Sequence, residues 1–107
     1  MHEKEIKGIE TELSCQTEFI KRGINVSVPV SAYCKYDFIA DIDGSLKKIQ
    51  VKTARKRTTG FMISTLSTHL TSNGARKNTY TEKEIDYFCT IYENQCYLIP
   101  VKEVIGR

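Results

Sequence analysis

Residues 36–53 read YDFIADIDGSLKKIQVKT, and this stretch gives the clearest indication of how the chain folds. Apolar and polar residues alternate on both sides of Asp43-Gly44, a dipeptide that favours a tight two-residue turn between strands. We therefore predict a β-hairpin with strands over residues 36–42 and 48–53. The alternation puts Asp37 on the more polar face of the first strand, and Gln50 with Lys52 on the polar face of the second.

The length of the turn sets which residues face each other across this hairpin. A two-residue loop places Asp37 opposite Gln50, whereas a four-residue loop places it opposite Lys52. Both even lengths bring Asp37, Gln50 and Lys52 to one face of the sheet. An odd loop or a bulge would separate them.

Outward from the hairpin, residues 3–22 predict an amphipathic helix that ends before Gly23. At about 100° per residue, one arc of this helix collects the large apolar side chains and is expected to be buried: Ile6, Ile9, Leu13, Ile20 and, at its edge, Phe19. Glu12 falls inside this arc. A buried carboxylate costs free energy unless it is paired, hydrogen-bonded or bound to a cation. Alternatively, its stem packs while its head reaches water.

The rest of the chain predicts further strands joined by polar turns. Strands are expected over residues 24–30, 61–66, 86–92 and 96–100, with a polar loop over 72–78. Thr81-Glu82-Lys83-Glu84 has the form of a capping box and predicts a short helical turn. These elements describe one α/β domain over residues 1–107, built around a mostly sequential sheet.

Composition excludes several classes of protein. The 107 residues are 40% hydrophobic and carry a formal charge of +3, which is ordinary for a soluble globular domain. No apolar run approaches the roughly 20 residues that cross a bilayer, and the N-terminus lacks the apolar segment of a signal peptide. We expect a soluble protein in the cytoplasm, with no membrane partner.

The four cysteines, Cys15, Cys34, Cys89 and Cys96, form no C-x₂-C pair. This spacing makes a zinc knuckle improbable. Nothing indicates an oxidising compartment in which disulfides persist. We interpret the cysteines as small buried hydrophobic residues.

Glu12, Asp37, Gln50 and Lys52 are expected to converge on one site. Carboxylate and amide oxygens suit a hard divalent cation such as Mg²⁺ or Mn²⁺. A lysine beside such a cation can neutralise charge on a phosphoryl oxygen. These groups together predict phosphodiester hydrolysis. The competing interpretation is an ion pair between Asp37 and Lys52 on an exposed face of the sheet, which would stabilise the protein little.

The ordered set of motifs resembles the PD-(D/E)XK nuclease superfamily, and within it the branch of group I intron homing endonucleases. The resemblance rests on Glu12, Asp37 and Gln50-Val51-Lys52, and a wider frame extends it over nearly the whole chain: Lys7-Gly8, Lys21-Arg22-Gly23, Ile85-Asp86-Tyr87-Phe88 and Tyr97-Leu98-Ile99-Pro100-Val101. Tyr36 stands in the proline position of the motif. Gln50 replaces an acidic residue, which removes one negative charge and should weaken cation binding.

The resemblance implies a restriction-endonuclease-like core, with a mixed central sheet and flanking helices. It also implies a Mg²⁺-dependent endodeoxyribonuclease of prokaryotic or phage-like origin that acts as a dimer or higher homo-oligomer. Glu12, Asp37 and Gln50 would hold the metal, and Lys52 would stabilise the transition state. The Arg and Gly-Ser-Gly features of Holliday-junction resolvases are not evident. A resolvase-like nuclease and a non-catalytic nucleic-acid-binding module with this fold remain the alternatives.

Basic residues flank the predicted hairpin and are candidate phosphate contacts: Lys47, Lys48, Arg55, Lys56, Arg57 and, on the expected loop, Arg76 and Lys77. Any one basic pair is more often a solvated face. Three clusters around one site favour DNA binding. Tyr33 and Tyr36 are candidates for stacking on bases, with packing in the core as the alternative.

Overall fold

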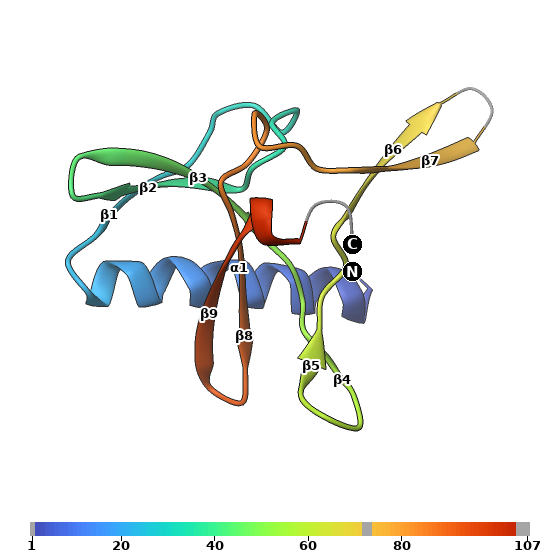
Figure 1. The fold of residues 1–107 in the computed structure, drawn as a ribbon, viewed down its shortest axis with the longest axis horizontal. Coiled ribbons are helices and arrows are strands. Elements are labelled where there is room, and N and C mark those ends of the chain that lie inside the picture. The colour runs from blue at the N-terminus through green and yellow to red at the C-terminus, as the bar shows by residue number, and fades with distance from the viewer. Residues whose placement is uncertain (1, 72–73, 105–107) are drawn as a thin grey trace.

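The structure is a computed structural model that describes residues 2–71 and 74–104, with only the backbone described for 67–71 and 74–78. Figure 1 shows its elements, which follow in chain order: α1 (Glu3–Lys21), β1 (Asn25–Ser27), β2 (Phe38–Ile42), β3 (Ser45–Val51), β4 (Arg55–Lys56), β5 (Phe61–Met62), β6 (Leu66–Thr71), β7 (Gly74–Thr79), β8 (Tyr87–Tyr92), β9 (Gln95–Pro100) and the 3₁₀ helix η1 (Val101–Glu103). Within these described residues, no helix is both long enough and apolar enough to span a membrane.

A five-stranded mixed sheet forms the centre of the fold. Its strand order is β1-β2-β3-β8-β9. The β3–β8 pair is parallel, and the other neighbouring pairs are antiparallel. The predicted α/β class with a mixed central sheet is confirmed. The described residues contain one α-helix, α1, where several flanking helices were expected.

The β2–β3 hairpin has the two-residue turn that Asp43-Gly44 predicts. Both turn residues have positive φ, 52° for Asp43 and 84° for Gly44, as a turn that follows the twist of the strands requires. Ile42 pairs with Ser45 at the turn, and Phe38 pairs with Ile49 at the other end. Continuing this register by one residue brings Asp37 opposite Gln50, as predicted for the shorter loop.

The buried face of α1 is not the predicted one. Its buried residues are Thr11, Cys15 and Phe19. Phe19, predicted at the edge of the apolar arc, is therefore buried as expected, whereas the rest of the arc faces outward, with Leu13 56% and Ile20 61% exposed. The small side chains of Thr11 and Cys15 allow the helix to lie close to the sheet. The Thr11 hydroxyl donates to the Lys7 carbonyl at 2.8 Å, so its burial leaves no hydrogen bond unmade.

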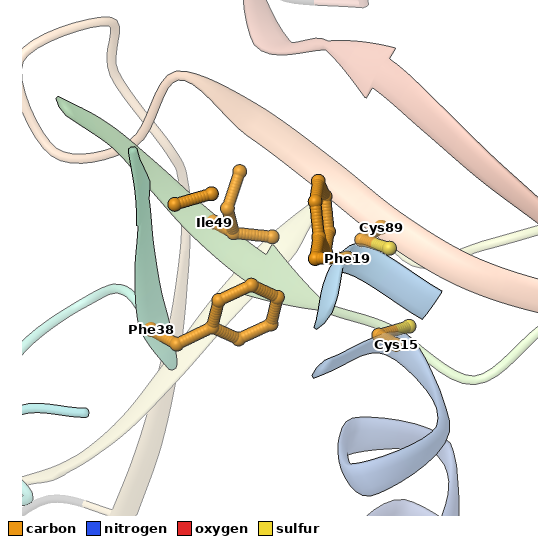
Figure 2. Close-up of a cluster of buried hydrophobic side chains, with 6 residues drawn as sticks. Cys15, Phe19, Phe38, Ile49 and Cys89 are labelled. Atoms are coloured by element: carbon orange, nitrogen blue, oxygen red, sulfur yellow. The ribbon is translucent and has the colours of Figure 1, made fainter. Parts of the chain in front are cut away.

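Large side chains of the sheet fill the layer beneath α1. The Phe19 ring meets the Phe38 ring edge-on, with centroids 5.5 Å apart. Ile49 and Cys89 complete this layer from β3 and β8, as Figure 2 shows. The layer fixes the helix against the middle of the sheet, which determines where Glu12 lies.

The opposite face of the sheet is covered by short segments. Ile85 and Phe88 pack there with Tyr80 and Val101. The predicted capping box forms a single turn, in which the Thr81 N–H donates to Oε1 of Glu84 at 2.9 Å. These segments give the sheet a second apolar layer.

Two hairpins occupy the connection between β3 and β8. β4 pairs with β5, and β6 pairs with β7, each as a separate two-stranded sheet; β6 and β7 project from the body of the molecule in Figure 1. The predicted strand over 61–66 is divided between β5 and the first residue of β6. The predicted loop over 72–78 is wrong for 74–78, which belong to β7, and 72–73 lie outside the described residues. Backbone pairing holds β7 without the apolar side chains on which the sequence prediction relied.

Candidate active site

An open cleft of about 440 Å³ lies between α1 and the hairpin of β2 and β3. Three of the predicted site residues line it: Glu12 on α1, Asp37, which directly precedes β2, and Gln50 on β3. The two-residue turn and the position of α1 on the sheet bring these side chains together. Thr53, just past the end of β3, also lines the cleft.

Asp37 is held by the backbone of the neighbouring strand. Its N–H donates to the Ile49 carbonyl at 2.7 Å, and its Oδ2 accepts the Val51 N–H at 2.8 Å. Burial raises the pKa of the Asp37 carboxyl, although the bond from Val51 and the charge of Lys52 both oppose this rise. The carboxylate is therefore held in place, and Val51 and Lys52 offset only part of the cost of burying its negative charge.

Glu12 is half-buried beside Asp37. Burial raises the pKa of the Glu12 carboxyl, and the negative charge of Asp37 raises it further. Two carboxylates that disfavour each other's ionisation gain from a cation bound between them. The Nε2 of Gln50 donates to the Val51 carbonyl at 3.3 Å, which leaves the amide oxygen as a third candidate ligand. This oxygen donor set fits a hard divalent cation.

Lys52 lies next to the cleft without lining it. Its Nζ donates to the Leu66 carbonyl at 3.0 Å and lies 5.0 Å from the centre of the Tyr80 ring. Its backbone N–H donates to the Cys89 carbonyl at 3.0 Å. Burial lowers the pKa of the Lys52 amine, while the charge of Asp37 opposes the decrease.

The competing interpretation of Asp37 and Lys52 as an exposed ion pair does not fit this geometry. Both side chains are partly buried, and the ion pairs found among the described residues, Lys21 and Arg22 each with Glu18, do not involve them. The amine of Lys52 has a carbonyl partner instead. The two groups influence each other through their charges and not through a direct contact.

A second pocket adjoins the cleft and shares two of its walls. It measures about 260 Å³ and lies between the Glu12 and Asp37 side chains and the segment over residues 28–36. Tyr33 in this segment is 96% exposed, whereas Tyr36 packs against the second apolar layer. Tyr36 also lines the second pocket, so it combines packing in the core with access to that pocket, and Tyr33 is exposed on the neighbouring segment.

The predicted basic residues are spread over three elements. Arg55 and Lys56 are exposed on β4, which follows Lys52 closely, and Arg57 comes next. The Nε of Arg57 donates to Sδ of Met62. Arg76 and Lys77 lie in β7, with side chains outside the described part of the structure. None of the described basic residues lines the cleft itself.

Lys47 and Lys48 are placed away from the cleft. Lys47 lines a separate pocket with the acidic residues Glu82 and Asp86. The Nζ of Lys48 donates to the Lys83 carbonyl, and its backbone N–H donates to Oδ2 of Asp86 at 2.8 Å. These contacts anchor β3 to the start of β8. These contacts give the backbone and the side chain of Lys48 a structural role.

Two features of the site were missed by the sequence analysis. The Tyr80 ring beneath Lys52 and the Cys89 carbonyl that fixes its backbone both come from segments far along the chain. No local pattern marks either contact, because they depend on β8 pairing in parallel with β3. The apolar alternation of residues 86–92 predicts a strand but not its neighbour.

The cleft, its oxygen ligands and the mixed sheet agree with the match of this chain to a known protein family. A family model described as PD-(D/E)XK endonuclease matches residues 1–107, and the chain belongs to this family. The resemblance inferred from Asp37 and Gln50-Val51-Lys52 is thereby confirmed.

Two known proteins are similar to the chain over its whole length or nearly so. Protein 5.3 of Escherichia phage T7 is 25% identical over 107 residues, which is 100% of this chain and 88% of the phage protein. The structure of the bacterial homing endonuclease I-Ssp6803I is similar with a TM-score of 0.83 and 23% identity, covering 99% of this chain and 74% of that one. This likeness confirms the restriction-endonuclease-like fold.

Proposed function

We propose that this chain is a metal-dependent DNA endonuclease that hydrolyses phosphodiester bonds at the cleft of Glu12, Asp37 and Gln50. The observation that carries the proposal is the convergence of two carboxylates and an amide on one open cleft, in a chain of the PD-(D/E)XK endonuclease family. Residues 1–107 would form one catalytic domain.

Glu12, Asp37 and Gln50 would hold the cation, Mg²⁺ with Mn²⁺ as a substitute. When bound, such a cation polarises the phosphate and lowers the pKa of water. The raised pKa values of Glu12 and Asp37 support this role, because a cation relieves both their burial and their repulsion. Asp37, fixed by the bond from Val51, would offer its carboxylate to the cation in a preorganised position.

Lys52 would stabilise the negative charge that develops on the phosphoryl oxygens in the transition state. Its Nζ donates to the Leu66 carbonyl, an uncharged acceptor at the first residue of β6. A phosphate offers a stronger, charge-assisted hydrogen bond. We expect substrate binding to draw the amine from Leu66 toward the cleft.

DNA would lie across the cleft and along β4. The exposed side chains of Arg55 and Lys56 support phosphate contacts next to the site, and Arg57, Arg76, Lys77 and Lys47 remain proposed contacts farther from it. Tyr33 beside the second pocket is suited to stack on an unpaired base. Membership of an endonuclease family supports a nucleic-acid substrate, and the similarity to a phage protein supports a prokaryotic or phage-infected cell as the place of action.

A homo-oligomer would present two such sites to the two strands. The exposed apolar stripe of α1 supports this assembly, because large hydrophobic side chains gathered on one helix face indicate an interaction surface: Ile6, Ile9, Leu13 and Ile20. A second copy of the chain could bury this stripe against its own.

A cleavage panel tests the proposed activity. Duplex, branched and single-stranded DNA are incubated with the protein in Mg²⁺, in Mn²⁺ and in EDTA, with Lys52→Ala alongside. We expect cleavage of at least one substrate that requires the cation and is lost in Lys52→Ala. Preferential cleavage of branched DNA would assign the resolvase-like alternative.

Two outcomes would reject the enzyme assignment. Salt-dependent DNA binding that is indifferent to EDTA, without cleavage of any substrate, would assign a non-catalytic binding module. The neutral Gln50 in an acidic position of the motif is the feature that favours this second function. Absence of both binding and cleavage would exclude nucleic acid as the partner.

A further inference from the structure

Three cysteines from separate elements meet at one edge of the layer beneath α1. The Sγ atoms of Cys15 on α1, Cys89 on β8 and Cys96 on β9 all lie within 4.8 Å of one another. Cys15 and Cys89 are buried, and Cys96 is half-buried. Figure 2 shows the first two projecting from the helix and the sheet into the same layer. Treating the cysteines as separate hydrophobic residues therefore misses their convergence.

The protonation of this cluster is uneven. Hydrogen bonds with Cys15 and Cys89, together with the nearby charge of Arg22, lower the pKa of the Cys96 thiol to about 3 despite its burial. Hydrogen bonds with Cys15 and Cys96, reinforced by burial, raise the pKa of the Cys89 thiol. These hydrogen bonds link the three cysteines into one cluster. Thiolate sulfur is the form that binds soft metal ions.

A disulfide between Cys89 and Cys96 fits the geometry of this strand pair less well than metal binding does. Cys89 faces Leu98 and Cys96 faces Ile91, so the two cysteines are diagonal neighbours with Cα atoms roughly 7–8 Å apart. A disulfide normally spans a Cα separation of about 4.4–6.8 Å. Their Sγ atoms are 3.5 Å apart. Two sulfur atoms that each lie about 2.3 Å from one tetrahedral Zn²⁺ are separated by a distance close to this Sγ–Sγ distance.

A small cavity beside Cys96 offers room for a fourth ligand. It measures about 40 Å³ and is lined also by Glu18, Arg22 and Leu98. A single ordered water needs roughly 10–15 Å³ of such volume. Among the described residues, no further histidine, cysteine or carboxylate joins the cluster. Of the three cysteines, Cys96 is the one that lines this cavity.

We propose that Cys15, Cys89 and Cys96 form a three-thiolate site for Zn²⁺, with a water molecule as the fourth ligand. Zn²⁺ binds thiolates, so each cysteine that is a thiol before binding gives up its proton when the ion is taken up. The product carries one net negative charge, which Arg22 next to the cavity partly offsets. The ion would join α1 to the β8–β9 hairpin.

This site lies outside the proposed nuclease cleft but is linked to its supports. Cys15 follows Glu12 by one turn of α1, and the Cys89 carbonyl accepts the backbone N–H of Lys52. Zn²⁺ would therefore stabilise the elements that carry Glu12 and Lys52. It would not contact the substrate.

Cobalt substitution tests this site in the full chain. The protein is purified in reducing, metal-free buffer and titrated with Co²⁺, whose thiolate complexes show a charge-transfer absorption that oxygen ligands do not give. We expect one thiolate-bound Co²⁺ per chain, its displacement by Zn²⁺, and release of protons as the ion binds. Zn²⁺ should also raise the Tm.

Cys96→Ser provides the variant and Cys34→Ser the matched control. Cys96 is the most accessible member of the cluster, and its replacement by an isosteric serine keeps the buried Cys15 and Cys89 in place. We expect Cys96→Ser to lose the absorption band and bind Zn²⁺ at least tenfold more weakly, with an unchanged circular dichroism spectrum. Cys34→Ser should match the wild type.

Three results would overturn the proposal: no thiolate band in the wild type, a band that survives in Cys96→Ser, or a Cys89–Cys96 disulfide in place of metal uptake. Each can occur whether or not the protein cleaves DNA. Conversely, loss of nuclease activity in Lys52→Ala leaves the cobalt band unaffected. The two proposals therefore fail independently.

Discussion

Asp37 combines a structural role with its proposed role as a metal ligand. Its N–H extends the β2–β3 ladder, and its carboxylate accepts the Val51 N–H. Its burial nevertheless penalises the charged form, as the raised pKa of Asp37 indicates. The same group thus maintains the cleft and destabilises the fold, a common cost of functional sites.

Asp37→Asn should stabilise the protein and abolish cleavage. The amide oxygen can still accept the Val51 N–H, and the buried charge is gone. Because the folded-state pKa of Asp37 is raised, the contribution of Asp37 to stability is most favourable below the ordinary aspartate value of 3.8 and is lost as the pH rises through the folded-state pKa. The urea midpoints of the wild type and of Asp37→Asn are measured from pH 3 to pH 7 in metal-free buffer. The midpoint of Asp37→Asn should exceed that of the wild type by a growing amount as the pH rises.

An equal difference between the two proteins at all pH values would show that the charge of Asp37 is not the cause. Glu18→Gln serves as the control, because Glu18 already pairs with Lys21 and Arg22 at the surface. Its midpoint should stay close to that of the wild type at every pH in this range, because Asp37 is unchanged in this variant.

Thr90 provides a second prediction at this scale. Its side chain is fully buried, and its Oγ1 has no hydrogen-bond partner among the described residues. Thr90→Val removes the unsatisfied hydroxyl while keeping the branched shape, so the free energy of unfolding should rise by about 1 kcal/mol. Chemical denaturation measures this change, and a loss of stability would indicate that the hydroxyl has a partner in solution.

Individual site residues were predictable where local alternation determined them. The spacing of Asp37, Gln50 and Lys52 on a hairpin with a two-residue turn brings their backbone positions together whatever the rest of the chain does. The contacts of the Lys52 amine with Leu66 and Tyr80 were not predictable. They require the course of the connection between β3 and β8, which no local pattern specifies.

At the scale of elements, α1 was predicted correctly in extent but not in orientation. Its largest apolar side chains suggested the buried face, yet the chain buries Thr11, Cys15 and Phe19 against Phe38 and Ile49. The sheet already supplies large side chains, so a close-packed interior favours smaller ones opposite. Glu12 remains half-buried in either orientation, which is why this residue was still found.

Replacement of the outward stripe of α1 should disrupt the proposed oligomer. Leu13→Glu with Ile20→Glu places two charges on this exposed face without touching the layer beneath the helix. We expect a wild-type dimer or higher oligomer by light scattering at micromolar concentration, and a monomer for the double variant with unchanged helicity. A monomeric wild type would reject this role for the stripe.

The contribution of β4 to DNA binding should appear in the salt dependence. Arg55→Gln with Lys56→Gln removes two exposed charges next to Lys52, while Arg57 is left in place. If both residues contact duplex phosphates, the slope of log K against log[salt] should decrease in magnitude by about 2. Binding is measured without divalent cation to prevent cleavage.

The matched control for β4 is Lys21→Gln with Lys102→Gln, which changes the net charge equally at exposed positions away from the cleft. Its slope should remain near that of the wild type. An equal decrease in both double variants would attribute DNA binding to overall charge and not to β4.

At the scale of the whole molecule, the sequence alone predicted the class of fold but not the assembly of its parts. Turn chemistry identified the β2–β3 hairpin of the main sheet. The parallel pairing of β3 with β8 was implied only through the family resemblance, since parallel neighbours are joined by long connections without a local signature. The convergence of Cys15, Cys89 and Cys96 depends on this pairing and was missed for the same reason.

The central claim is that Glu12, Asp37, Gln50 and Lys52 form a metal-dependent nuclease site. Its most direct test is the single-turnover rate of DNA cleavage in Mg²⁺ by wild type, by Lys52→Met and by the control Lys21→Met, with DNA affinity measured in Ca²⁺. We predict a rate at least 100-fold lower for Lys52→Met at nearly unchanged affinity, and a wild-type rate for Lys21→Met. Equal cleavage by Lys52→Met and wild type, or cleavage that persists in EDTA, would contradict this account.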